Sequence, residues 1–205
     1  MNPDIPSLRK KRIPPPLFKY NLRADPPKRP DFDTAKPAIF LDRDGTLMEE
    51  VGYCTKAKHV RVFSNASNSL HRLRKDGYLT IIITNQSGIG RGLILEEDYQ
   101  KVHNEFLLQV GPELVDWTYF CPDHPDRPTP RRKPCIGMIE EAVRDFHIDL
   151  TRSWMIGDKA SDIECGKAAG LKTILVATGY GADQECQPDY RVRDVAAAVD
   201  WIVVK

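Results

Sequence analysis

The sequence lacks the features that would place the protein in a membrane or in an oxidising compartment. Its 205 residues contain no run of about 18 apolar residues, so no membrane span is predicted. The N-terminus has no apolar signal-peptide core after Arg9–Arg12. The five cysteines are odd in number and include no Cys-x-x-Cys pair, which favours free thiols in a reducing environment. We therefore expect a soluble, cytoplasmic chain.

A large net charge of either sign is also missing, because 30 basic residues face 29 acidic ones. Residues 1–37 nevertheless hold 9 basic against 4 acidic residues, together with 9 of the 16 prolines and none of the 13 glycines. Proline at this density blocks helices and sheet ladders, so residues 1–36 are predicted to be a basic arm, extended or disordered. Residues 37–205 form the predicted domain, whose 21 basic and 25 acidic residues argue against a nucleic-acid partner.

Beyond Pro37, short apolar runs alternate with segments of helical periodicity. Strands are predicted at 38–41, 79–83, 117–120, 154–156 and 173–176, and helices at 64–75, 96–110, 138–146, 161–169 and from 195 onward. This alternation predicts an α/β fold, a Rossmann-like doubly wound parallel sheet covered by helices on both faces. In such sheets the ligand binds outside the carboxyl ends of the strands.

Polar residues that could bind a ligand or take part in catalysis follow three of these predicted strands or lie between them. They are Asp42-Arg43-Asp44-Gly45-Thr46, Thr84-Asn85-Gln86-Ser87-Gly88, Arg132-Lys133 and Gly157-Asp158-Lys159 with Asp162. Because the carboxyl ends of parallel strands meet at one edge, we expect these residues to converge on a single site.

The side-chain types in these segments are those of phosphoryl transfer. Asp42 and Asp44 stand two apart, so both can reach one substrate atom, and one of the two pKa values is expected to rise. Together with Asp158 they offer the oxygen ligands that Mg²⁺ prefers. Lys133 supplies a positive charge, and Thr84 with the amides after it can donate to phosphate oxygens. Positioned cations and donors are what a phosphoryl-transfer transition state needs.

In this order the motifs resemble those of the haloacid dehalogenase superfamily of phosphotransferases, over about residues 37–180. Within it, the sequence looks most like the subfamily of D-glycero-D-manno-heptose 1,7-bisphosphate phosphatases and histidinol-phosphate phosphatases. The segments that carry this likeness are Phe40–Thr46, Gly52-Tyr53, Thr84–Ile89, Arg91-Gly92, Arg132–Pro134, Gly157–Lys159 and Thr178-Gly179.

The resemblance implies catalytic roles for particular residues. Asp42 would attack phosphorus and form an aspartyl phosphate, and Asp44 would protonate the leaving group and then deprotonate water. Thr84 and Lys133 would hold the phosphoryl group, and Mg²⁺ would be bound by Asp42, the backbone carbonyl of Asp44, and Asp158.

The resemblance also implies the surroundings of that centre. Asp162 would orient Lys133 or the metal shell. Contacts to the rest of the substrate are expected from Arg43, Glu50, Val51, Gly52, Tyr53, Asn85, Gln86, Ser87, Arg132 and Lys159.

The sequence departs from this subfamily at its usual structural zinc site of Cys-x-His and Cys-x-Cys. Cys121 is retained, but Asp123 stands where the histidine is expected, and the second pair is replaced by Thr129 and Arg131. A tetrahedral site needs four ligands. Since Cys121 could be joined only by His124 and Cys135, a structural zinc is not expected, and the proline-stiffened loop 125–131 would replace it.

The spacing of the motifs leaves little room for a separate cap domain. From Asp42 to Thr84 is 42 residues and from Thr84 to Lys133 is 49, and the predicted strands and helices nearly fill both intervals. We therefore expect an open, uncapped site whose loops supply selectivity.

These observations favour a monomeric Mg²⁺-dependent phosphatase that acts on a small phosphorylated sugar, with heptose bisphosphate as the leading substrate. Histidinol phosphate is one alternative. Another is a nucleic-acid-end phosphatase guided by the basic arm, and deletion of residues 1–36 would separate it from the sugar phosphatases.

Overall fold

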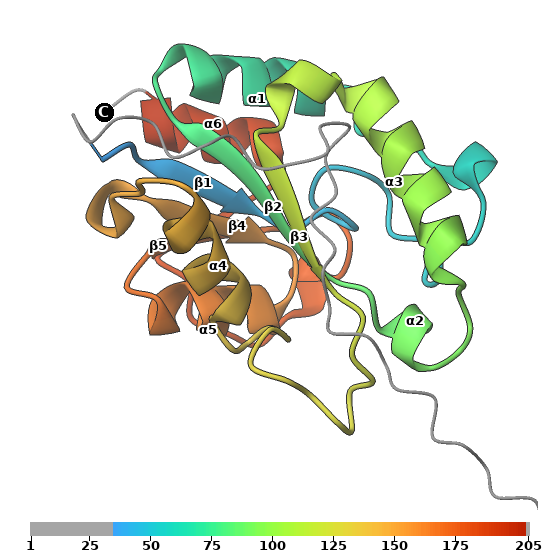
Figure 1. Ribbon diagram of the computed structural model, residues 1–205. Helices are drawn as coiled ribbons and strands as arrows, with labels where there is room; N and C mark the ends of the chain where they lie inside the picture. Colours follow the sequence, from blue (N-terminus) through green and yellow to red (C-terminus); the bar gives the residue numbers. More distant parts are fainter. Residues whose placement is uncertain (1–34, 204–205) are drawn as a thin grey trace, which may run out of the picture.

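The computed structural model describes residues 35–203 (Figure 1). Its strands are β1 (Ala38–Leu41), β2 (Leu79–Asn85), β3 (Trp117–Cys121), β4 (Trp154–Gly157), β5 (Lys172–Val176) and β6 (Tyr190–Val192). Its α-helices are α1 (Ala66–Lys75), α2 (Ser87–Gly90), α3 (Glu96–Val110), α4 (Gly137–Asp145), α5 (Ala160–Ala168) and α6 (Val195–Val203). Short 3-10 helices lie at Ala57–His59, Pro112–Leu114, Leu150–Arg152 and Gly181–Asp183.

The six strands form one parallel sheet in the order β3-β2-β1-β4-β5-β6. The chain builds outward from β1 through β2 to β3 and then crosses back to place β4 on the other side of β1. The strand order therefore reverses at the β1–β4 pair, and open α/β sheets bind ligands at the carboxyl ends of the strands at such a point.

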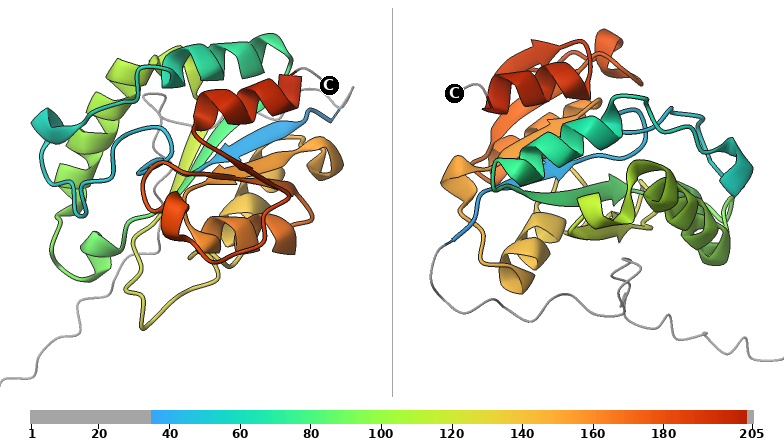
Figure 2. Two further views of the ribbon diagram at one scale, coloured as in Figure 1. Left: turned by 180° about the vertical axis from the view of Figure 1, so that it is seen from behind. Right: turned by 90° about the horizontal axis from the view of Figure 1, so that it is seen from above.

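Helices cover both faces of this sheet (Figures 1 and 2). Alternate residues of a strand point to opposite faces, so Ile39 and Leu41 join the core beneath α1, α3 and α6. Ala38 and Phe40 join the second core, beneath α4 and α5. All four residues of β1 are fully buried, which explains why this strand is an uninterrupted apolar run.

The predicted fold class, a doubly wound α/β sheet, is confirmed. Each of the five predicted strands is present, and no cap domain is evident in residues 35–203. The edge strand β6 was not predicted, because it has three residues and none of them is buried. The single-turn helix α2 was not predicted either, because its Ser-Gly-Ile-Gly sequence is typical of a turn.

The predicted arm lies outside the described residues apart from Ala35 and Lys36. The backbone of Lys36 pairs with His147 and Asp149, at 2.9 Å in both hydrogen bonds, and the Ala35 carbonyl accepts from Arg152 Nη2 at 2.9 Å. These two residues are thus attached to the domain. Within residues 35–203, none of the helices has the length and apolarity required to cross a membrane.

Candidate active site

A cavity of about 410 Å³ opens at the carboxyl ends of β1, β2 and β4. Its walls are polar and come from segments that are far apart in the sequence. The lining residues are Asp42, Asp44, Glu50, Gly52, Tyr53, Thr84, Asn85, Gln86, Ser87, Gly88, Arg132, Lys133, Lys159, Ser161, Asp162 and Tyr180.

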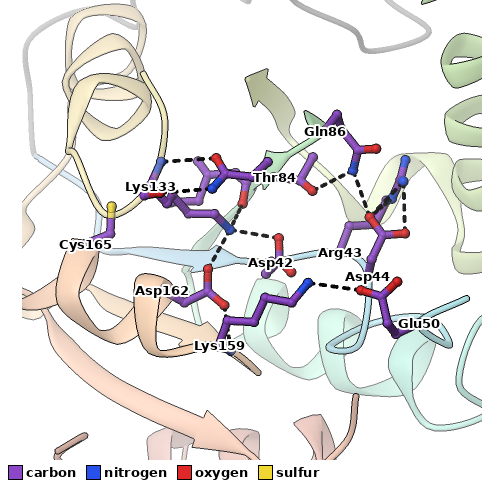
Figure 3. Close-up of polar contacts among 12 residues, drawn as sticks. Asp42, Arg43, Asp44, Glu50, Thr84, Gln86, Lys133, Lys159, Asp162 and Cys165 are labelled. Atoms are coloured by element: carbon purple, nitrogen blue, oxygen red, sulfur yellow. Dashed lines mark hydrogen bonds and ion pairs between the residues drawn. The ribbon is translucent and has the colours of Figure 1, made fainter. Parts of the chain in front are cut away.

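The ammonium group of Lys133 lies at the centre of this site (Figure 3). Its Nζ is 2.8 Å from Asp42 Oδ1 and 2.7 Å from Asp162 Oδ1, and it donates to the Ile83 carbonyl at 2.7 Å. Burial disfavours the charged form of this lysine, but Asp162 and Asp42 outweigh that effect and raise its pKa above the ordinary value. Lys133 is therefore a buried cation that is paired with two carboxylates and one carbonyl.

Asn85 fixes the loop that carries Lys133. Its side-chain amide donates to the Lys133 carbonyl at 3.0 Å and accepts from the Lys133 N–H at 3.1 Å. Asn85 was predicted to contact the substrate; its amide makes this reciprocal pair of hydrogen bonds at the wall of the cavity. The pair links the end of β2 to a residue 48 positions further along the chain.

Three buried carboxylates, Asp42, Asp158 and Asp162, each place an oxygen within 4.8 Å of the others. Burial raises the pKa of a carboxyl group, but at Asp42 the charges of Lys133 and Lys159 overcome it, and its pKa is lowered. Burial and the charge of Asp42 instead raise the pKa of Asp158 to about 8. Burial also raises the pKa of Asp162, despite its contact with Lys133.

A raised pKa was expected within the Asp42–Asp44 pair. The pKa of Asp42 is instead lowered, and the raised values are those of Asp158 and Asp162, which are buried beside Asp42. Asp44 lies elsewhere, against Arg43 and Gln86.

Two glycines let the backbone close around Asp158. Gly45 has φ +87° and Gly179 has φ +58°, and a Cβ atom at either position would collide with the Asp158 carboxylate. Asp158 Oδ2 accepts from the Tyr180 N–H at 2.9 Å, while Oδ1 has no hydrogen-bond partner among the described residues. An enclosed carboxylate oxygen without a partner, beside two further carboxylates, fits a divalent cation with oxygen ligands.

Asp44 belongs to a second hydrogen-bond network (Figure 3). The Arg43 guanidinium donates to both of its oxygens, at 2.8 Å for Nη2 to Oδ2 and 3.0 Å for Nη2 to Oδ1. Gln86 Nε2 donates to Asp44 Oδ2 and to Thr84 Oγ1, at 2.9 Å in each case. Thr84 and Asp44 are thereby connected through a single side chain.

Two residues predicted to contact the substrate, Arg43 and Val51, do not line the cavity. Arg43 is 1% exposed and does not line the cavity, because its side chain turns under Asp44. Val51 is 45% exposed and also does not line it. The remaining predicted contacts, namely Glu50, Gly52, Tyr53, Asn85, Gln86, Ser87, Arg132 and Lys159, do line it.

Lys159 lies at the rim of the cavity. Its Nζ is 3.0 Å from Glu50 Oε2 and 4.8 Å from the centre of the Tyr180 ring. Burial lowers the pKa of Lys159, but Asp42, Asp158 and Glu50 outweigh burial and raise it. The cavity is also lined by Tyr180, Ser161 and Gly88, which were not predicted as site residues. The Thr178-Gly179 motif immediately before Tyr180 was the available signal for that residue.

The loop after β3 is held by protein groups. Asp123 accepts from the Thr129 N–H at 2.6 Å, and His124 Nδ1 accepts from the Asp126 N–H at 3.2 Å. Cys121 packs into the apolar core, where burial raises the pKa of its thiol to about 12. Asp123, which replaces the expected zinc-ligand histidine, thus closes the loop by a hydrogen bond.

Comparison with known proteins agrees with this geometry. The family described as HAD-hydrolase-like matches residues 130–200. A D-glycero-D-manno-heptose-1,7-bisphosphate 7-phosphatase of Chlorobaculum tepidum is 37% identical over 187 residues, which cover 81% of this chain and 94% of that protein. The chain belongs to the haloacid dehalogenase-like hydrolases. It is a phosphoric monoester hydrolase.

Further members of this hydrolase family extend the comparison. A D-glycero-alpha-D-manno-heptose-1,7-bisphosphate 7-phosphatase of Photorhabdus laumondii is 40% identical over 152 residues, covering 69% of this chain and 82% of that one. The crystal structure of the heptose 1,7-bisphosphate phosphatase of B. bronchiseptica, complexed with magnesium and phosphate, superposes with a TM-score of 0.75 at 27% identity. The match covers 82% of this chain and 98% of that chain.

Proposed function

We propose that this phosphatase removes the C7 phosphate of D-glycero-D-manno-heptose 1,7-bisphosphate, with Mg²⁺, through an aspartyl phosphate on Asp42. The observation that carries the proposal is the buried contact of Lys133 with Asp42 in the wall of a polar cavity. The names of the relatives and of the structural neighbour support this choice of substrate.

In the first half-reaction, Asp42 acts as the nucleophile. Lys133 and Lys159 stabilise its ionised form, so a carboxylate oxygen is available to form a bond to phosphorus. The same Lys133 ammonium, 2.8 Å from Asp42, then lies within reach of the phosphoryl oxygens, as does the hydroxyl of Thr84. The bond from phosphorus to the sugar oxygen breaks, and Asp44 gives that oxygen a proton.

In the second half-reaction, a water oxygen bonds to phosphorus, and the bond from phosphorus to Asp42 breaks. Asp44, now a carboxylate, takes the proton of that water. Asp44 therefore ends the cycle as it began, and inorganic phosphate leaves.

Asp42, Asp158 and the backbone carbonyl of Asp44 would hold the Mg²⁺ ion. When bound, Mg²⁺ supplies positive charge that neutralises the phosphoryl oxygens in the transition state. Asp162 stays against Lys133, at 2.7 Å, and holds the ammonium toward the site.

A bisphosphate suits the charge at the rim of the cavity. Arg132 and Lys159 line the cavity in addition to Lys133, so two further cations can face the second phosphate. Tyr53 and Tyr180 also line it and are 46% and 47% exposed, which leaves aromatic surface for the sugar.

A phosphate-release assay tests this proposal. The full chain is given heptose 1,7-bisphosphate, histidinol phosphate or a 5′-phosphorylated oligonucleotide, with Mg²⁺ or with a chelator. We expect fastest release from the heptose at C7, loss of release with the chelator, and no turnover for Asp42→Asn, because an amide cannot be the nucleophile. Turnover by Asp42→Asn would refute the mechanism, and preference for either other substrate would refute the assignment.

A further inference from the structure

Arg43 follows the nucleophile directly in the chain, yet its side chain lies beneath the site. It is 1% exposed, and its guanidinium lies over the ring of Tyr99 at 5.3 Å from the ring centre. Burying a guanidinium is costly unless it is paired, and within residues 35–203 the carboxylate that pairs with it is that of Asp44. The cost of burying the Arg43 guanidinium, and its position against Asp44, indicate that Arg43 acts through Asp44.

The two carboxylate oxygens of Asp44 accept unequal numbers of hydrogen bonds. Oδ2 accepts from Arg43 Nε at 3.1 Å, from Arg43 Nη2 at 2.8 Å and from Gln86 Nε2 at 2.9 Å. Among the described residues, Oδ1 accepts from Arg43 Nη2 alone, at 3.0 Å. A carboxylate oxygen has two lone pairs, so Oδ2 is saturated and Oδ1 retains the capacity to carry a proton.

Gln86 ties this carboxyl group to the phosphoryl-binding hydroxyl. Its single amide nitrogen donates to Asp44 Oδ2 and to Thr84 Oγ1. Because Thr84 Oγ1 accepts from Gln86, its own proton is directed to another acceptor, such as a phosphoryl oxygen. The positions of Asp44 and of the transferring group are therefore set by one connected network.

We propose that Arg43 is a positioning residue, which with Gln86 aims Asp44 Oδ1 at the leaving-group oxygen. This inference rests on the proposed function, since it takes Asp42 as nucleophile and Asp44 as acid. As Asp42 bonds to phosphorus, the electron pair of the breaking bond stays on the sugar oxygen, which takes the proton from Asp44 Oδ1. In the second half-reaction the same oxygen takes a proton from the attacking water.

Dependence on the leaving group separates this role from a structural one. A sugar alkoxide is a poor leaving group and needs the proton, whereas a dinitrophenolate leaves without one. We therefore expect Arg43→Met to lower kcat/KM about 100-fold for the heptose bisphosphate, the loss typical of a misplaced catalytic group. For dinitrophenyl phosphate the expected loss is below about threefold, since proton donation contributes little there.

Three further variants keep the test decisive. Arg43→Lys retains the charge but loses the forked guanidinium, so it should lose activity selectively on the sugar phosphate. Gln86→Met removes the second donor to Oδ2 together with the bond to Thr84, so its loss should be larger on the sugar phosphate than on dinitrophenyl phosphate. Arg74→Met removes another arginine–aspartate pair, with Asp116 at 2.6 Å, near the start of β2 and away from the cavity, so its two kcat/KM values should not change.

The outcomes distinguish this inference from the proposed function. Equal losses on both substrates, in Arg43→Lys and Gln86→Met as well as in Arg43→Met, would overturn the positioning role, as would no loss on either. If Arg43→Met does not fold, the other two variants decide the matter by the same criterion. Failure of the wild-type chain to release phosphate from the heptose, or turnover by Asp42→Asn, would instead refute the proposed function.

Discussion

Magnesium binding should be tightly coupled to proton release, because one proposed ligand is held in its protonated form near neutral pH. Burial and the charge of Asp42 place the pKa of Asp158 at about 8. A carboxyl group must lose its proton before it binds a metal ion. At pH 6 about 1% of Asp158 is ionised and at pH 8 about half is, so the apparent affinity for Mg²⁺ should rise about 50-fold, or roughly 2.3 kcal/mol.

Titration calorimetry at pH 6, 7 and 8 measures this effect. Repeating the pH 7 titration in two buffers with different ionisation enthalpies counts the protons released, and about 0.9 proton per Mg²⁺ is expected from the same pKa. Asp200→Asn is a suitable control, because it removes a carboxylate of α6 that pairs with Arg72 outside the cavity. Its pH dependence should match that of the wild type.

The same pKa fixes the sign of the stability change. Folding raises the pKa of Asp158 from 3.8 to about 8, so between these values the folded state binds more protons than the unfolded state. Without Mg²⁺, the free energy of unfolding contributed by Asp158 should therefore fall as the pH rises toward 8, and saturating Mg²⁺ should offset that loss. A Mg²⁺ affinity that changes less than about threefold from pH 6 to pH 8, without proton release, would refute the reasoning.

Three other substitutions test the supports of the site. Asp162→Asn removes one of the two carboxylates against Lys133, so kcat/KM should fall about 10- to 100-fold, and an unchanged value would contradict the proposed role of Asp162. Asn85→Ala removes both hydrogen bonds to the Lys133 backbone, about 2 kcal/mol in total, and thermal unfolding should show a Tm lower by about 4–8 °C. Gly179→Ala combines backbone strain of about 1–2 kcal/mol with a collision at Asp158, so calorimetry should show weaker Mg²⁺ binding. The matched Gly170→Ala, at φ +74° with nothing within 4 Å of the added Cβ, should lose stability alone, and equal Mg²⁺ affinities would exclude the collision.

Much of the fold could be predicted from local pattern. The run Ala38–Leu41 is apolar throughout because β1 is central and buried on both faces, and that pattern is visible in the chain. The short edge strand β6 has no such pattern, because an edge position with half-exposed residues places little demand on composition. Local pattern therefore identified the interior strands and missed the edge.

The location of the chemistry also followed from the sequence. Polar residues after buried parallel strands must meet at one edge of the sheet, and Asp42, Thr84, Lys133 and Asp158 are brought together there. The order of the motifs also predicted membership of the haloacid dehalogenase family, which the comparisons confirm.

Which partner each side chain takes was decided only in three dimensions. Lys133 meets Asp42 across 91 residues of sequence and Asn85 across 48, and no local pattern encodes such contacts. Burial and neighbouring charge raise the pKa of Asp158, and the guanidinium of Arg43 pairs with Asp44. Residue type and spacing thus determined the chemical groups and the edge where they gather, whereas their pairing and protonation depend on distances and burial that exist only once the sheet has formed.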